Sequence, residues 1–189
     1  NFTDANGIGG FRFEPPTGSL ALCTANMTDA DYAPIGPNSL VGNPDQHFDT
    51  VLWSGNGNED TIYRHMRGLD FKPDLVWTKA RDQGIPAGIW DSVRGTGDKA
   101  LVPSGGAAEG SVGHETYDWL DSFDEGGFTS KLNDTGQVPY YFNKTSSEYI
   151  AWCWKAGNGS VLNNDGNVET TLSANPDAGF SIVGYDGHF

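Results

Sequence analysis

Residues 149–157 read Tyr149-Ile-Ala-Trp-Cys-Trp-Lys-Ala-Gly157, and this stretch decides the fold class. A helix is disfavoured because the run is short, ends at Lys155-Ala-Gly157 and is rich in strand-forming residues. In a strand both faces are apolar, with Tyr149, Ala151 and Cys153 on one face and Ile150, Trp152 and Trp154 on the other. Such a strand is typical of the buried centre of a sheet.

The two faces of this strand need cover from different parts of the chain. We expect Trp152 and Trp154 to pack against an opposite sheet. Tyr149 and Cys153 are then covered by the 95–113 loop, the upstream segment or a neighbouring module. If that second face is open to solvent, it is the best candidate for an assembly surface.

The composition indicates an all-β protein. The 189 residues include 26 Gly and 10 Pro, and 6 Trp, 7 Tyr and 10 Phe supply a core. Windows with a 3.6-residue apolar period are missing, so little helix is expected. We predict an antiparallel β-sandwich of the lectin-like or jelly-roll kind, with long Gly/Asn-rich loops. Its predicted core includes Trp53, Trp77, Trp152, Cys153 and Trp154.

The charge and the cysteines exclude several classes of protein. A net charge of -14 and a pI of about 4.3 disfavour binding to nucleic acid, whose phosphates an acidic surface repels. No apolar run is long enough to cross a membrane. Two cysteines, Cys23 and Cys153, allow one disulfide, but we favour two free, buried thiols.

Changes in composition divide the chain into four segments. Residues 1–27 resemble the last strand and tail of an upstream unit, and 28–46 have the Pro/Gly composition of a linker. The main sandwich covers 47–175, and 176–189 begin a second repeat or form a closing strand. Within the sandwich we expect an exposed loop at 95–113, a strand at 138–142 and a solvent-facing hairpin at 161–171. The repeat is suggested by an echo of residues 48–56 in residues 180–188, where Phe, Val, an aromatic residue and Gly recur in register.

Five motifs in order carry a family resemblance: Phe71-Lys-Pro-Asp-Leu-Val-Trp-Thr-Lys79, Trp90-Asp-Ser-Val-Arg-Gly95, Leu120-Asp-Ser-Phe-Asp-Glu-Gly-Gly-Phe128, the 149–157 stretch and Ser173-Ala-Asn-Pro-Asp-Ala-Gly-Phe-Ser-Ile-Val183. Together they resemble a module of large virion proteins of marine bacteriophages, found in tail-fibre or structural proteins. The resemblance covers about residues 46–189. Upstream, residues 13–26 resemble the end of a SPRY-type module, which is a lectin-like β-sandwich.

This resemblance implies a function without supplying catalytic residues. We expect a non-enzymatic structural or adhesion module on the virion surface, in a tail fibre or a similar appendage. Its expected partners are copies of itself, other virion proteins and host-surface glycans. The alternatives are a dedicated carbohydrate-binding module, a glycan-degrading enzyme and a pure spacer or capsid-decorating protein.

Acidic side chains are the residues on which an enzyme would depend. Asp118, Asp121, Asp124 and Glu125 cluster in sequence, and glycosidases use two carboxylates about 5–10 Å apart. Strand alternation separates Asp118 from Asp121, so solvated acids at a strand edge and turn are the favoured interpretation. The His residues lack metal-ligand spacing. Asn163-Asn-Asp-Gly-Asn167 has an oxygen-rich turn composition, which leaves Ca²⁺ near Asp165 as a minor alternative to a hairpin turn.

Two further groups of residues are singled out. Arg94 is expected to pair with Asp91 or Asp74 and to fix the turn at Gly95. Exposed aromatic side chains stack on sugars, and the candidates for glycan contact are Trp90, Trp119, Tyr140 and Tyr141.

Overall fold

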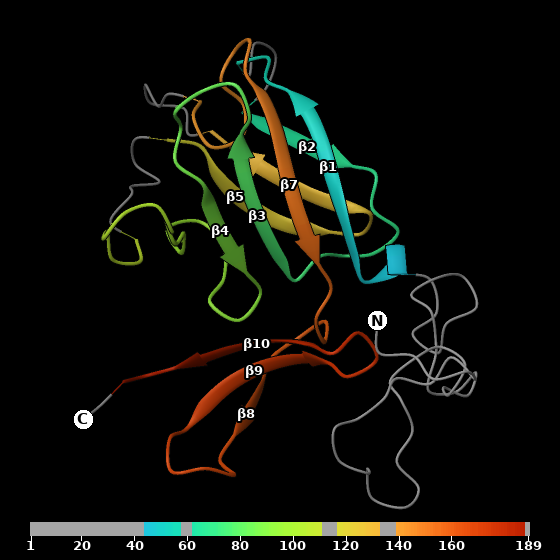
Figure 1. Cartoon of the computed structure of the whole chain (residues 1–189), viewed down its shortest axis with the longest axis vertical. Coiled ribbons are helices and arrows are strands. Elements are labelled where there is room, and N and C mark those ends of the chain that lie inside the picture. The colour runs from blue at the N-terminus through green and yellow to red at the C-terminus, as the bar shows by residue number, and fades with distance from the viewer. Residues whose placement is uncertain (1–43, 58–61, 111–116, 133–138, 188–189) are drawn as a thin grey trace, which may run out of the picture.

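The computed structural model describes residues 44–57, 62–110, 117–132 and 139–187. The SPRY-like segment 1–27, Cys23 and most of the 28–46 linker lie outside these ranges. The described part is all-β, which confirms the predicted fold class: three antiparallel sheets pack together, and two of them form a sandwich (Figure 1). A short 3-10 helix, η2 (Pro44–Gln46), precedes the first strand.

The first sheet contains the strand predicted to be central. Its order is β1-β7-β3-β4, so β7 has a neighbour on each side. All three pairings are antiparallel, and the strands are β1 (Phe48–Ser54), β7 (Glu148–Trp154), β3 (Leu75–Ala80) and β4 (Gly88–Asp91).

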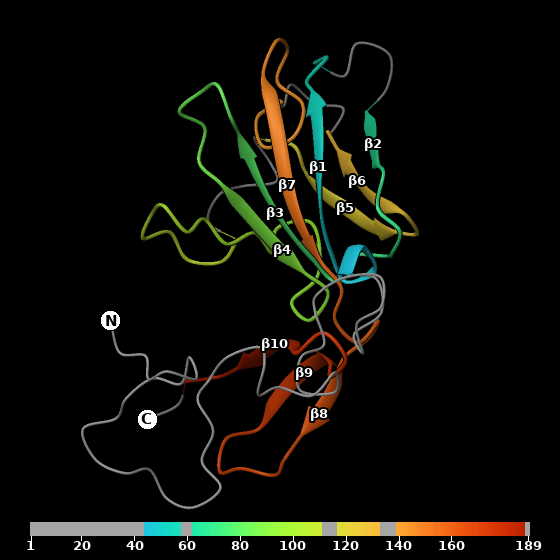
Figure 2. The same cartoon turned by 45° about the vertical axis from the view of Figure 1, so that its right-hand side comes forward.

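The second sheet closes the sandwich. Its order is β2-β6-β5, with β2 (Tyr63–Arg67), β6 (Gly127–Lys131) and β5 (Trp119–Asp124). Figure 2 shows it stacked behind the first sheet. The core between them takes Val51, Val76, Ala151 and Cys153 from the first sheet and Met66, Leu120 and Phe128 from the second. Burying these apolar side chains is the main force that holds the two sheets together.

The two faces of β7 are reversed relative to the prediction. Tyr149, Ala151 and Cys153 are fully buried, and Ala151 and Cys153 lie in the core between the two sheets. Trp152 and Trp154 lie on the other face, which points away from the second sheet, and both are partly exposed. The reason is the size of the side chains. Ala151 and Cys153 are small and allow the second sheet to pack closely, whereas the indole rings of Trp152 and Trp154 would hold it further away.

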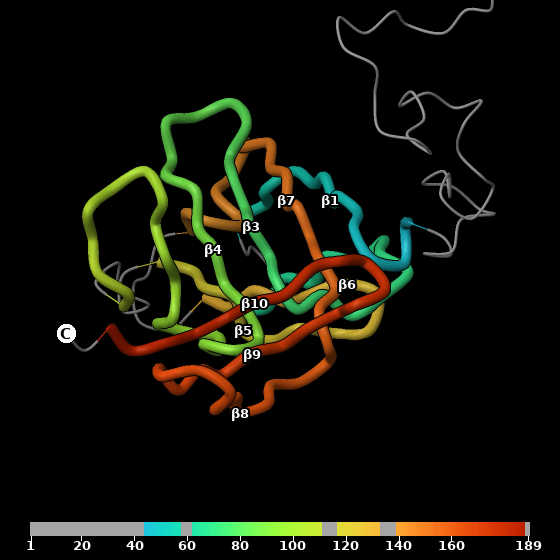
Figure 3. Tube along the Cα trace, turned by 60° about the horizontal axis from the view of Figure 1, so that its bottom comes forward, coloured from blue at the N-terminus to red at the C-terminus, as the bar shows by residue number. Residues whose placement is uncertain are grey.

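The third sheet lies across one end of the sandwich (Figure 3). Its order is β10-β9-β8, and its strands are β8 (Val161–Asn163), β9 (Thr170–Asn175) and β10 (Phe180–Tyr185). The predicted 161–171 hairpin is therefore present. One face is buried through Ser173 and Ile182, while Val161 and Val183 on the other face are 60% and 50% exposed. The echoed segment 180–185 thus pairs with β9 as a hairpin strand.

One strand prediction and one loop prediction were wrong. Residues 138–142 were expected to form a strand, but the described residues 139–143 form an irregular loop. The 95–113 stretch was expected to be an exposed loop, yet Ala100 and Val102 are core residues and Leu101 forms a bridge with Ile89 of β4. The glycine-rich composition of this stretch suggested a loop, but its three apolar residues, Ala100, Leu101 and Val102, lie along the edge of the first sheet.

Candidate functional site

The outer face of the first sheet is an exposed apolar surface within the part of the chain that the structure describes. We use "outer face" for the side of β1, β7, β3 and β4 that points away from the second sheet, together with Leu101. One row of register partners crosses it: Thr50, Trp152, Trp77, Ile89 and Leu101. The Trp77 and Trp152 rings lie at its centre, 5.7 Å apart and tilted by 56°.

The outer face is apolar and open. Its exposed large side chains are Leu52 at 58%, Phe48 at 41%, Leu101 at 39% and Trp77 at 37%. Trp77 was predicted to be a core residue, so this prediction was wrong, and Trp152 and Trp154 are only partly buried. Trp53, by contrast, packs against the core, stacks on Tyr149 and donates from its ring nitrogen to the Phe142 carbonyl at 2.6 Å.

The lysine on the outer face has its charged end turned away from the aromatic row. Lys79 Nζ donates to three backbone carbonyls in the loop after β3, those of Ala80, Gln83 and Ile85, at 2.7, 3.2 and 2.8 Å. The ammonium group is thereby hydrogen-bonded at the edge, and the aliphatic stem remains on the face. At the end of β7, Glu148 accepts a hydrogen bond from Ser54 at 2.8 Å. The centre of the face is therefore uncharged.

The predicted glycan-contact residues do not form one surface. Trp90 and Tyr141 are 1% and 2% exposed and pack in the core, so the prediction was wrong for both. Each is buried because it fills space between the sheets, where Trp90 contacts Phe142 with ring centres 5.1 Å apart. Burial raises the pKa of Tyr141 to about 12. Tyr140, the third candidate, is half-buried and stacks on Tyr117.

Trp119, the fourth candidate, lies on the far side of the molecule from the outer face. It is partly exposed on β5 and pairs in register with Lys131 of β6, which in turn pairs with Tyr63 of β2. The Lys131 ammonium lies 5.2 Å from the Tyr63 ring centre and 6.0 Å from that of Trp119. The Lys131 ammonium thus makes cation–π contacts with both Tyr63 and Trp119 within the protein.

Asp118 is a buried structural carboxylate, and its predicted position at a solvated edge was wrong. It is 2% exposed, and its two oxygens accept hydrogen bonds from the four backbone amides of residues 140–143, at 2.6 to 3.1 Å. Burial raises its pKa to about 6, although these four amides act to lower it. The irregular 139–143 loop follows from this contact, because consecutive amides of an extended strand point in opposite directions.

The neighbouring acids have separate environments. Asp124 accepts a hydrogen bond from Thr129 at 2.5 Å and forms an ion pair with Arg67 at 3.0 Å. Partial burial acts to raise its pKa, but the hydroxyls of Thr129 and Ser122 and the charge of Arg67 hold the pKa below its ordinary value. Asp121 is half-buried on β5 and Glu125 is exposed in the following turn. Asp118 and Asp124 therefore do not form the pair of carboxylates that a glycosidase needs, because Asp118 is enclosed by the 140–143 amides.

The predicted Arg94 unit is confirmed, with Asp91 as the partner. Nε and Nη2 of Arg94 both donate to Asp91 Oδ2, at 2.7 and 2.6 Å. Asp91 Oδ1 accepts hydrogen bonds from the backbone amides of Val93 and Arg94. The next residue, Gly95, has a φ of +106°, a conformation that favours glycine. The unit therefore fixes the turn that follows β4.

Asp74, the other partner considered for Arg94, has a role that sequence reasoning missed. It is 2% exposed and accepts hydrogen bonds from Ser92 Oγ at 2.7 Å and from the backbone amides of Ala156 and Asn158 at 2.7 and 3.3 Å. It connects the start of β3 to the segment that leads from β7 to the third sheet. Its position before a strand in Lys72-Pro-Asp74 was the one available signal.

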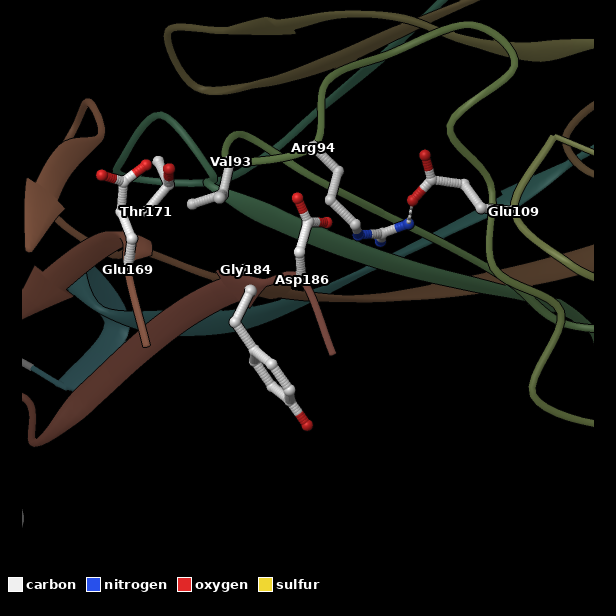
Figure 4. Close-up of a pocket in the computed structure, with 8 residues that line it drawn as sticks. Val93, Arg94, Glu109, Glu169, Thr171, Gly184 and Asp186 are labelled. Carbon is white, nitrogen blue, oxygen red and sulfur yellow. Dashed lines mark hydrogen bonds and ion pairs between the residues drawn. The ribbon is translucent and has the colours of Figure 1, made fainter. Parts of the chain in front are cut away.

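A polar hollow of about 360 Å³ lies between the Arg94 turn and the third sheet (Figure 4). On one side of the hollow, Arg94 and Glu109 form an ion pair at 3.4 Å. On the other side lie Glu169 just before β9, Thr171 within β9 and Asp186 just after β10. Glu169 and Asp186 also line an adjoining hollow of about 300 Å³. Within the described ranges, no three His, Cys, Asp or Glu side chains are grouped as a metal site requires.

An aromatic cleft of about 330 Å³ lies where the outer face meets the third sheet. It is lined by Pro44, His47, Phe48, Trp154 and the 178–180 turn. Phe48 and Phe180, the first residues of the two echoed segments, both contact Trp154, with ring centres 4.9 and 6.1 Å away. The echo in sequence thus corresponds to two phenylalanines that share one tryptophan.

Three remaining predictions concern the calcium site, the thiols and the membrane. Asp165 lies in the β8–β9 turn, where its amide donates to the Asn163 side chain at 2.8 Å, as in an Asx turn. Cys153 is a free, buried thiol, as predicted, and burial raises its pKa. In the part of the chain that the structure describes, no helix is long and apolar enough to span a membrane.

Comparison with known proteins assigns the chain to a family, but no activity is known for that family. A family described as a domain of unknown function matches residues 43–188, which include all three sheets. No curated protein and no solved structure matches the chain.

Proposed function

The chain belongs to the domain-of-unknown-function family DUF7483, and we propose from its own structure that it is a non-enzymatic structural and adhesion module of a phage virion protein. The observation that carries the proposal is the open, apolar outer face. Continuous exposed apolar patches of several hundred Å² are often surfaces that contact another molecule. The resemblance to virion modules supplies the context, an appendage on the particle surface.

The buried charged groups support a structural role. Asp74, Asp91 and Asp118 each use their carboxylate oxygens to hold backbone amides of loops between strands. Buried carboxylates committed in this way fix the loops and leave no oxygen directed at a substrate. The thiol of Cys153 is enclosed between the sheets, and its raised pKa keeps it protonated at neutral pH.

A dedicated carbohydrate-binding module is the second candidate, and the aromatic cleft favours it. The cleft is concave and presents Trp154 and Phe48 beside His47, a combination of aromatic and polar groups that suits a sugar ring. On this alternative the part of the outer face around Leu52, Trp77 and Leu101 serves assembly, and the cleft serves recognition of host-surface glycans.

The experiment that tests the proposal locates the chain on particles. Antibodies are raised against two epitopes, one centred on Trp77 of the outer face and one on Trp119 of the second sheet. We expect immunogold microscopy to label an appendage through the Trp119 epitope on intact particles. The Trp77 epitope should become accessible only after dissociation. Antigen found only in the particle-free fraction would contradict the proposal, as would release of reducing sugars when the purified chain is incubated with polysaccharides.

A further inference from the structure

The outer face has the size of a weak protein interface. Leu52, Phe48, Leu101 and Trp77 are the four exposed large side chains on it, and partly exposed Ile150, Trp152 and Ile89 fill the spaces between them. Taking about 150–250 Å² for each large side chain, the four exposed ones present about 350 Å², and the partly exposed ones bring the apolar area to on the order of 500 Å². Two such faces bury on the order of 1,000 Å² together, the lower limit for a specific interface.

The charges of the molecule restrict what can approach this face. The chain has a net charge of -14, so two copies repel each other over most of their surfaces. The outer face is the exception, because the Lys79 ammonium is bound to loop carbonyls and Glu148 lies at the end of β7. A second copy can therefore come close here without placing carboxylates opposite one another.

The geometry favours a protein sheet over a glycan at this surface. The row from Trp152 to Leu101 is apolar, and Thr50 at one end supplies its single hydroxyl. Recognition of a sugar requires several converging polar groups, whereas two sheets pack face to face about 10 Å apart through apolar side chains alone. A twofold axis near the Trp77–Trp152 pair brings the same row of each copy together.

We propose that the outer face is the interface of a homodimer, in which the first sheets of two copies of this chain pack against each other. This inference rests on the proposed structural function and names its partner. Association buries the four exposed side chains and leaves the third sheet and the loops free. Because apolar contact drives it and like charges oppose it, the dimer becomes stronger as salt screens the repulsion.

The test is sedimentation velocity of the full chain over a range of protein and NaCl concentrations. We expect a reversible monomer–dimer equilibrium whose association constant rises with salt. Leu52→Glu, at a side chain 58% exposed on the outer face, should weaken association at least tenfold. Val161→Glu is the matched control, because Val161 is 60% exposed on the third sheet and the charge change is the same. Circular dichroism confirms that both variants are folded.

Three results would overturn the dimer. They are a wild-type chain that stays monomeric at every salt concentration, a dimer that survives Leu52→Glu, and a dimer that Val161→Glu abolishes instead. The proposed function fails separately, through the absence of the chain from particles. A monomeric chain on particles thus rejects the second copy as partner and retains the structural role.

Discussion

The Asp118 carboxylate lies 2.6 Å from the backbone nitrogen of Tyr141, 23 positions further along the chain. This contact and its three neighbours tie the start of β5 to the loop that precedes β7. The carboxylate is enclosed by protein, so the free energy of the fold depends on whether Asp118 is charged. Its pKa of about 6 lies above the ordinary value of 3.8 because burial disfavours the anion.

The stability of the protein should therefore depend on pH through Asp118. A pKa raised in the folded state contributes stability that is fully present below the unfolded pKa of 3.8 and is lost as the pH rises through about 6. The shift corresponds to about 3 kcal/mol, of which about 1.4 kcal/mol falls between pH 5 and 8. Asp118→Asn removes this titration, so the variant's loss of stability should be about 1.4 kcal/mol greater at pH 5 than at pH 8.

Urea unfolding followed by tryptophan fluorescence at the two pH values measures this difference. Both values lie above the pI of about 4.3, where the protein keeps its negative charge. The other acids titrate in both proteins and cancel in the comparison. A loss of stability that is the same at pH 5 and pH 8 would contradict a raised pKa for Asp118.

Arg94→Lys should destabilise the protein by about 1–3 kcal/mol, because lysine cannot make the two contacts to Asp91 and the 2.6 Å contact to the Lys99 carbonyl together. Arg67→Lys is the matched control. Arg67 is paired with Asp124 but is 46% exposed, and an exposed pair contributes about 0–1 kcal/mol. Thermal unfolding of both variants measures the difference, and equal losses would show that the Arg94 turn is not a structural centre.

Phe180→Ala should loosen the third sheet without unfolding the sandwich. Phe180 stacks on Trp154 at 6.1 Å with ring planes 20° apart, and its loss removes an aromatic contact between β10 and β7. We expect hydrogen exchange of amides in residues 170–185 to accelerate at least tenfold, while amides of β3 and β7 keep their protection. Val183→Ala, at a half-exposed side chain on the far face of the same sheet, should leave both unchanged. Uniform acceleration throughout the chain would indicate that the three sheets unfold as one unit.

The central strand of the fold could be predicted from sequence, but which of its faces packs against the second sheet could not. Alternation of apolar side chains identified β7 and its double-sided character, because a strand exposes its two faces at every second residue. It could not say which face met the second sheet, since both faces were apolar. Ala151 and Cys153 were the available signal, as small residues allow a close approach between sheets.

The residues that fix the loops were only partly predictable. Arg94 and Asp91 are three positions apart, so their pairing could be inferred from local spacing. Asp118 and Asp74 act on amides 22–25 and 82–84 positions away. Apart from the position of Asp74 before a strand, nothing in the local pattern distinguishes such a carboxylate from a solvated one, because the distinguishing partners are backbone groups that every residue has.

The sequence by itself determined an all-β chain with a central aromatic strand, an acidic surface and an Arg94 turn, because periodicity, composition and short spacings are local properties. The tertiary structure alone decided that Trp77 and Trp152 lie on an open face, that Trp90 and Tyr141 are buried, and that Asp118 is enclosed by amides. Exposure is set by what the rest of the chain places against a side chain. That placement depends on contacts between residues far apart in sequence, and it turned an expected core into the outer face on which the proposed function rests.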